Sequence, residues 1–105
     1  MDDRELLELA AKAVGIKFTW ADGLNESPVL DNGETWNPIT DDGDALRLAV
    51  KLNLRINIDF DTADEYVKVY WGDKADSREA EGSDPYAATR RAIVRAAAEI
   101  GKEME

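Results

Sequence analysis

The sequence contains no cysteine and no histidine among its 105 residues. Without cysteine, neither a disulfide framework nor a thiolate metal site can form. Without histidine, the chain lacks the commonest general base and the commonest metal ligand in proteins. We therefore expect no metal ion, no cofactor and no catalytic residue set, and we predict that the protein is not an enzyme.

Long apolar runs and basic charge are also scarce. No window is long enough and apolar enough to span a membrane, and the N-terminus lacks the basic start and the cleavage site of a signal peptide. The net charge of −10 argues against direct binding to nucleic acid or anionic lipid, because neutralising phosphates requires a basic patch. We expect a soluble, cytoplasmic protein with no membrane partner and no direct nucleic-acid partner.

The charges are unevenly placed along the chain. Residues 22–44 hold seven acids and no base, whereas residues 85–98 hold three arginines and no acid. This distribution predicts an acidic surface and a smaller basic stripe.

The stretch 36–60 predicts one helix that leads directly into one strand, and the other elements are expected to cover these two. An acidic cluster suits the helix start, where carboxylates accept hydrogen bonds from unpaired backbone N–H groups, and either Thr40 or Asp42 is the N-cap. Leu46 pairs with Val50, and further apolar residues fill a wide neighbouring face, which predicts that this helix is covered on more than one side. Strict alternation from residue 54 to residue 61 then predicts a strand with one buried face.

The segments before this stretch predict a helix and weaker strands. Asp2 and Glu5 have the spacing of a capping box, and Gly15 is well placed to end the first helix. Alternation over 16–20 predicts a short strand. Residues 24–35 form a loop or a small irregular hairpin around Asn32-Gly33, and a brief strand is expected at 34–36.

The segments after it predict a second strand and a final helix. Alternation over 66–71 predicts the partner strand, and the polar composition of 73–83 predicts a mobile loop. Asp84-Pro85 is a strong helix start. The last helix is expected to bury Tyr86, Thr89, Ile93, Ala96, Ala97 and Ile100.

These elements define the expected fold class. Their order is α-β-(β)-α-β-β-α, with three helices and a small, mainly antiparallel sheet in two layers. Such a segregated arrangement is an α+β fold, and residues 1–105 are expected to form a single domain.

Three short segments carry a resemblance to a known family: Trp36-Asn37-Pro38-Ile39, the acidic run into Asp44-Ala45, and Asp84-Pro85-Tyr86-Ala87-Ala88. They resemble small phage and prophage proteins whose function is not characterised, including the NinX proteins of lambdoid phages. The resemblance covers roughly residues 5–100 and includes the order of helices and strands. It implies a viral accessory protein that acts inside a bacterium, and it brings no activity and no catalytic residues.

Carboxylates are the only abundant reactive groups. One cluster comprises Asp41, Asp42 and Asp44, and a second lies within 59–65. Either could hold a hard cation, and a metal-dependent hydrolase is the corresponding alternative. Neither cluster matches the calcium-loop pattern, however, and helix capping and turn formation are the favoured roles.

Aromatic and basic residues give the better candidates for an interaction surface. Trp36 lies outside the regular elements and either plugs the core or stands at the surface as an anchor. Tyr66 and Tyr70 flank Lys68 on one face of their strand, and they invite a partner only if no helix covers that face. The candidate interaction residues are Trp36, Tyr66, Lys68, Tyr70, Arg91 and Arg95.

Three kinds of partner remain open. The leading hypothesis is a non-enzymatic module that binds a host or phage protein. The second is an acidic decoy that occupies the DNA-binding site of a host nucleic-acid-binding or defence protein. A homodimer is the third: the alanine-rich last helix and the strand edges can pair two copies, with Arg90, Arg91 and Arg95 meeting an acidic surface on the neighbouring copy.

Overall fold

The computed structural model describes residues 2–20, 28–59, 66–71, 74–80 and 84–104. Within these residues the chain forms three helices and five strands, and the predicted α+β class is confirmed. In chain order the elements are α1 (Asp3–Val14), β1 (Phe18–Trp20), β2 (Pro28–Leu30), α2 (Asp42–Lys51), β3 (Arg55–Asp59), β4 (Tyr66–Trp71), β5 (Lys74–Ala80) and α3 (Pro85–Glu103). None of the described helices is long and apolar enough to cross a membrane.

The strands form two separate antiparallel sheets. One contains β3, β4 and β5 in that order, and the other pairs β1 with β2. The prediction of a loop over 73–83 is wrong for Lys74–Ala80, because this segment pairs with β4 along its length. The polar composition of this segment did not indicate a strand, because backbone groups make the hydrogen bonds to β4 and these bonds do not require apolar side chains.

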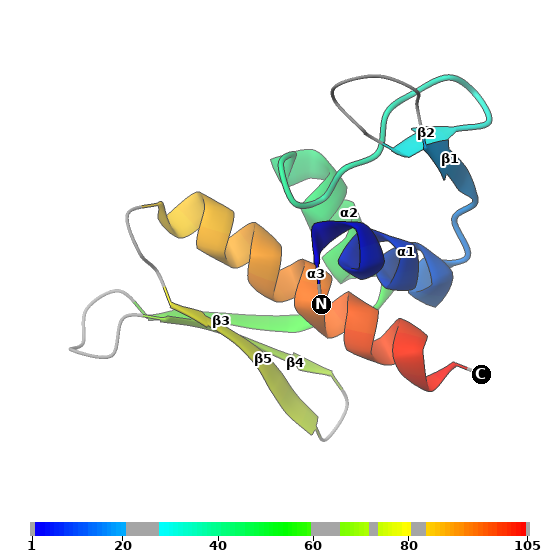
Figure 1. The fold of residues 1–105 in the computed structure, drawn as a ribbon. Coiled ribbons are helices and arrows are strands. Elements are labelled where there is room, and N and C mark those ends of the chain that lie inside the picture. Colours follow the sequence, from blue (N-terminus) through cyan, green and yellow to red (C-terminus); the bar gives the residue numbers. More distant parts are fainter. Residues whose placement is uncertain (1, 21–27, 60–65, 72–73, 81–83, 105) are drawn as a thin grey trace.

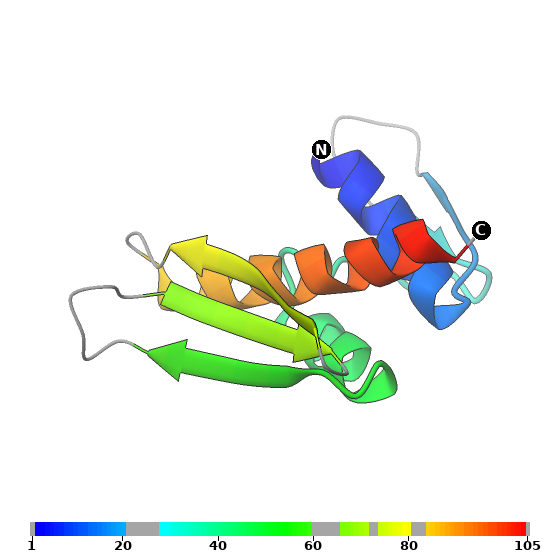
Figure 2. The same ribbon diagram turned by 90° about the horizontal axis from the view of Figure 1, so that it is seen from below.

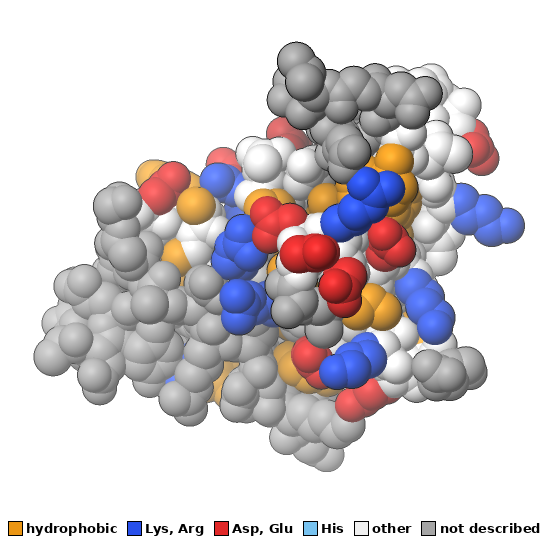
Figure 3. Space-filling view, in the orientation of Figure 1, with side chains coloured by type: hydrophobic (Ala, Val, Ile, Leu, Met, Phe, Trp, Pro, Cys, Tyr) orange, Lys and Arg blue, Asp and Glu red, His pale blue; other side chains and the backbone are white. Residues whose placement is uncertain are grey.

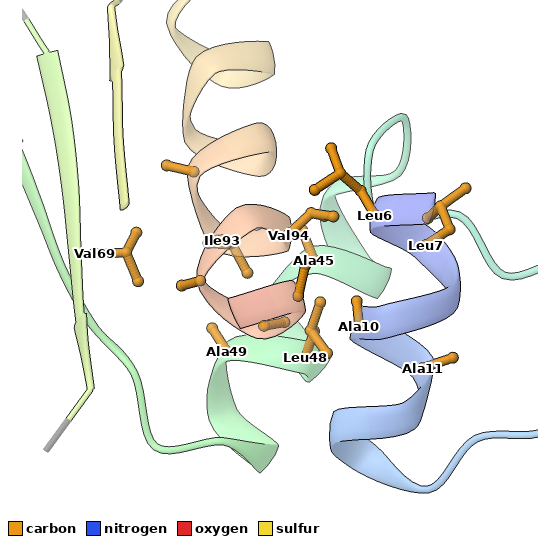
Figure 4. Close-up of a cluster of buried hydrophobic side chains, with 14 of the residues drawn as sticks. Leu6, Leu7, Ala10, Ala11, Ala45, Leu48, Ala49, Val69, Ile93 and Val94 are labelled. Atoms are coloured by element: carbon orange, nitrogen blue, oxygen red, sulfur yellow. The ribbon is translucent and has the colours of Figure 1, made fainter. Parts of the chain in front are cut away.

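Helix α3 lies between the larger sheet and helix α1, and α2 packs beside it (Figure 1). Figure 2 shows the sheet from its other side, where no described helix covers it. Small residues line α3 where it meets its neighbours, including Ala92, Ala96 and Ala97, which are fully buried. Figure 4 shows Val69 of the sheet facing α3, and Leu48 and Ala10 approaching α3 from α2 and α1.

The segment before α2 forms the small irregular hairpin that the sequence allowed. Its turn has Gly33 at a positive φ of 88°. Thr35 makes a single bridge to Val29, and the Trp36 N–H donates to the Pro28 carbonyl at 2.9 Å, so the expected strand over 34–36 is reduced to one bridge. The Trp36 side chain is 5% exposed, and its ring centroid lies 6.0 Å from that of Phe18. Of the two predicted alternatives for Trp36, core packing is confirmed.

The helix boundaries follow the capping signals in two helices. The Asp2 carboxylate accepts from the Glu5 N–H at 2.9 Å, and Gly15 ends α1 in the left-handed conformation. Asp84 caps α3 by accepting from the backbone N–H groups of its first turn.

The cap of α2 is neither of the two predicted residues. Asp41 occupies this position, with its carboxylate 2.8 Å from the Asp44 N–H. A tight turn explains the difference, because the N–H groups of Thr40 and Asp41 both donate to the Asn37 carbonyl. The turn leaves Asp41 in extended geometry just before the first helical residue.

Three apolar side chains that were expected to be buried are exposed. On α2, Ala45, Leu48 and Ala49 are buried, but Leu46 is 60% exposed and Val50 is 71% exposed. The prediction that α2 is covered on more than one side is therefore wrong for the described residues, because α2 packs against the core through one face only. Tyr86, in the first turn of α3, is 70% exposed, so the prediction that α3 buries it is also wrong.

Candidate interaction surface

An apolar groove of about 510 Å³ lies between α2, β3 and the first turns of α3, and we call it the α2–α3 groove. Its apolar lining residues include Leu46 and Ala45 of α2, Ile56 of β3, and Tyr86 and Ile93 of α3. The groove is also lined by Asp42, Pro85, Thr89 and Arg90.

The groove combines a buried base with exposed apolar walls. Ala45 and Ile93 are 2% and 3% exposed, so they belong to the core. Leu46 and Tyr86 are exposed, and they come from two different helices. This arrangement presents a large aromatic side chain and a branched aliphatic one to solvent beside a preformed hollow, which is typical of binding sites for apolar anchors.

Arg90 fixes the relative position of the two helices that form the groove. Its Nε donates to the Ile39 carbonyl at 2.8 Å, and its Nη1 donates to the Asp42 carboxylate at 2.6 Å. The Arg90 side chain is only 17% exposed, whereas that of Asp42 is 71% exposed. Arg90 therefore joins α3 to the start of α2 and makes this part of the groove lining polar.

The acidic cluster at the start of α2 has structural partners. Asp41 caps the helix, and the Asp44 carboxylate accepts from the Asn37 N–H at 2.9 Å and from Arg47 at 2.7 Å. The hydrogen bond with Asp44 raises the pKa of Arg47. These contacts match the capping role that the sequence favoured for this cluster.

The metal alternative finds no geometric support in the described part of the chain. There, no group of three or more acidic side chains is placed to hold a metal ion. Of the second carboxylate cluster, residues 60–65 and the Asp59 side chain lie outside what the structure describes.

The predicted aromatic face lies on the uncovered side of the larger sheet. Val67 and Val69 are fully buried against α3, so Lys68 and Tyr70, which alternate with them, belong to the opposite face. Both are half-buried, and the Arg55 guanidinium lies 5.5 Å from the centroid of the Tyr70 ring. No described helix covers this face, as the prediction required, but the Tyr66 side chain lies outside the described structure.

Arginines of the predicted basic stripe form ion pairs with acidic residues of the same chain. Arg91 binds the Asp3 carboxylate at 3.0 Å and so connects α3 to α1, and Arg90 binds Asp42. Arg95 is exposed on the same helix. On the face shown in Figure 3, basic and acidic side chains are intermixed rather than separated.

A second hollow, of about 450 Å³, lies between α2, the end of α1 and the β2 hairpin. Val14, Leu30 and Leu48 contribute apolar surface, but Glu34, Asp44, Arg47 and Lys51 also line it. Its walls lack an exposed large apolar side chain comparable with Leu46 or Tyr86. The α2–α3 groove is therefore the better candidate.

Leu46, Ile56 and Tyr86 were not among the interaction residues predicted from the sequence. One signal could have found the first of them: α2 is apolar over more of its circumference than one packing contact covers. No family model, no curated protein and no solved structure matches the chain.

Proposed function

We propose that the protein is a non-enzymatic interaction module that binds a host or phage protein through the α2–α3 groove. One observation carries the proposal: Leu46 and Tyr86 stand 60% and 70% exposed on either side of an apolar hollow. A partner that covers them gains about 25 cal/mol for each Å² of apolar surface removed from water. The phage or prophage origin and the bacterial host rest on the sequence resemblance alone.

The composition of the groove fits a protein partner. Protein interfaces concentrate their binding energy in a few aromatic and aliphatic anchors that enter well-packed pockets. Tyr86 supplies such an aromatic group with a polar end, and Ile56 and Ile93 supply apolar surface between the helices and the sheet. The Arg90–Asp42 ion pair adds a polar boundary that a partner segment can recognise.

The ion pairs favour this proposal over an acidic decoy. A decoy must present carboxylates as an array that replaces phosphates. In the described structure, Asp3, Asp42 and Asp44 are each paired with an arginine of the same chain. These pairs reduce the negative field along α1 and at the start of α2, within the described part of the chain.

The test is affinity capture of the tagged full chain from a bacterial host, with washes at low and high salt. A partner held by an apolar groove survives the high-salt wash, because burial of apolar surface is not screened by ions. Leu46→Asp and Tyr86→Asp should each abolish capture of that partner.

Val50→Asp is the matched control, since Val50 is an equally exposed apolar residue on α2 that does not line the groove. Circular dichroism of the three variants should be measured to check that each is folded. Capture that is unchanged in Leu46→Asp and Tyr86→Asp would refute the groove as the binding site. A nucleic-acid-binding partner that is lost at high salt would support the decoy instead.

A further inference from the structure

Strand β3 has a free edge in the described structure. It pairs with β4 on one side, and no described strand pairs with its other side. A free edge carries backbone N–H and C=O groups that can bond to another strand, and proteins protect such edges with charge, bulges or proline. These devices are found at the other edge of this sheet, where β5 has a sequence rich in charged residues and an irregular register opposite Val69 and Tyr70.

β3 lacks two of these devices, a bulge and a proline. It pairs regularly with β4 over all five of its residues, and its sequence contains no proline. Of the two edge strands of this sheet, β3 has the regular register, and its sequence alternates isoleucine with polar residues.

The β3 sequence, Arg-Ile-Asn-Ile-Asp, is complementary to itself. If two copies run antiparallel about Asn57, position 55 of one copy lies opposite position 59 of the other. The register then places an arginine opposite an aspartate twice, and an isoleucine opposite an isoleucine twice. Opposite charges and apolar pairs at such positions stabilise antiparallel strands.

We propose that a second copy of this chain pairs with the free edge of β3 and forms a symmetric dimer with a continuous sheet. Opposed residues of antiparallel strands lie on the same face, so a pairing about Asn57 puts both α3 helices on one side of the joined sheet. Ile56 belongs to both β3 and the α2–α3 groove, so the dimer carries two grooves on that side. The inference goes beyond the proposed function and does not depend on it.

The charge pattern selects a second copy over an unrelated extended segment. An unrelated segment has no reason to carry aspartate and arginine at the two positions that β3 requires, whereas the chain itself carries both. The net charge of −10 on each copy opposes association. Salt at about 0.15 M screens that repulsion beyond roughly 8 Å and leaves the close cross-strand pairs less affected.

The test is sedimentation equilibrium of the full chain at about 0.15 M salt, over a wide range of concentration. We expect a monomer–dimer equilibrium. Arg55→Asp and Asp59→Arg should each weaken the dimer about tenfold or more, because each creates two like-charge pairs across the symmetry axis. The double variant with both substitutions should recover the dimer to within about threefold, because it restores both opposite-charge pairs in reverse order.

Lys17→Asp is the matched control, since Lys17 is exposed beside β1 and its substitution changes the charge as Arg55→Asp does. It should leave the dimer unchanged. A wild-type chain that stays monomeric at every concentration would overturn the inference. A dimer that is insensitive to both single variants, or is not recovered in the double variant, would assign the association to another surface.

A disulfide test does not depend on these charge variants. The chain has no cysteine, so Asn57→Cys introduces a single thiol at the position that the register places opposite itself. Opposed residues of antiparallel strands have Cα atoms about 4.5–5.5 Å apart, within the range of a disulfide. Mild oxidation should therefore link Asn57→Cys into a covalent dimer and leave Lys17→Cys mainly monomeric; equal, slow linkage of both variants would contradict the register.

Discussion

Gly101 of α3 lies directly against the backbone of α1, and replacing it with alanine should destabilise the fold. A Cβ atom built at Gly101 lies 2.0 Å from the Leu9 carbonyl oxygen and 2.9 Å from the Leu9 carbonyl carbon. Contacts below 3.0 Å are essentially never shown by real Cβ atoms. Because the obstructing atoms belong to the backbone of α1, no side-chain rotation can relieve the clash, and the two helices must separate by about 1 Å or more.

The expected loss follows from two opposing effects. Overpacking a close interface costs about 1–3 kcal/mol, and the rigid backbone contact places Gly101→Ala toward the upper end of that range. Alanine recovers up to about 1 kcal/mol through its higher helix propensity. The net loss of unfolding free energy is therefore about 2 kcal/mol, out of a total of about 5–15 kcal/mol for a domain of this size. The corresponding fall in Tm is roughly 8–16 °C.

Urea unfolding and thermal unfolding, followed by far-UV circular dichroism, measure this difference. Gly43→Ala is the matched control, since Gly43 lies in α2 and its added Cβ would meet side-chain atoms of Arg47 and Asp41 at 3.3 Å, and no backbone atom. That substitution should change the unfolding free energy by less than about 1 kcal/mol. A Gly101→Ala variant as stable as the wild type would refute the close α1–α3 contact.

Three further substitutions test how the helices are held. Asp84→Ala removes the carboxylate that accepts from the first N–H groups of α3, and urea unfolding should show a loss of about 1 kcal/mol; an unchanged midpoint would mean that water replaces the cap. Arg90→Met keeps the apolar stem but leaves the Ile39 carbonyl without its donor, so the same assay should show a loss of about 1–3 kcal/mol. Asp42→Asn should cost less than about 1 kcal/mol because the Asp42 carboxylate is largely exposed, and an equal loss in both variants would contradict this ranking.

Local signals in the sequence predicted most of the helices and the central strand. Asp2, Gly15 and Asp84 act through backbone groups within a few residues of themselves, so their roles can be inferred without knowing the tertiary structure. The alternation that predicted β3 and β4 is equally local, and the pairing of Ile56 with Val69 confirms that these strands are neighbours.

The features that were predicted wrongly depend on backbone geometry and packing that composition and spacing do not specify. The cap of α2 depends on a turn closed by the Asn37 carbonyl, and the composition of that turn does not distinguish among three nearby candidates. β5 depends on pairing with β4, which a polar sequence does not reveal. Tyr86 has the spacing of a buried residue on α3, but it lies in the first turn, beside the groove rather than within the core.

The candidate site was missed for a related reason. Sequence patterns identify residues that can be buried, but they do not show whether a neighbour is present to bury them. Trp36 and Leu46 illustrate both outcomes. For Trp36 the sequence allowed either burial or exposure, and its side chain is buried in the core. For Leu46 the sequence predicted burial, but its side chain is exposed in the described structure.

The exposure of Leu46 and Tyr86 is not required by the stability of the domain. Ala45, Leu48 and Ala49 already attach α2 to the core, and Asp84 and Pro85 already begin α3, so polar residues at positions 46 and 86 would fold equally well. In the described structure, each of these side chains instead leaves much of its apolar surface in contact with water. The two side chains come from helices that Arg90 holds together, and they converge on one hollow that Ile56 extends to the free edge of β3. The proposed binding role would explain this convergence, and the groove and the strand edge are the surfaces on which to test it.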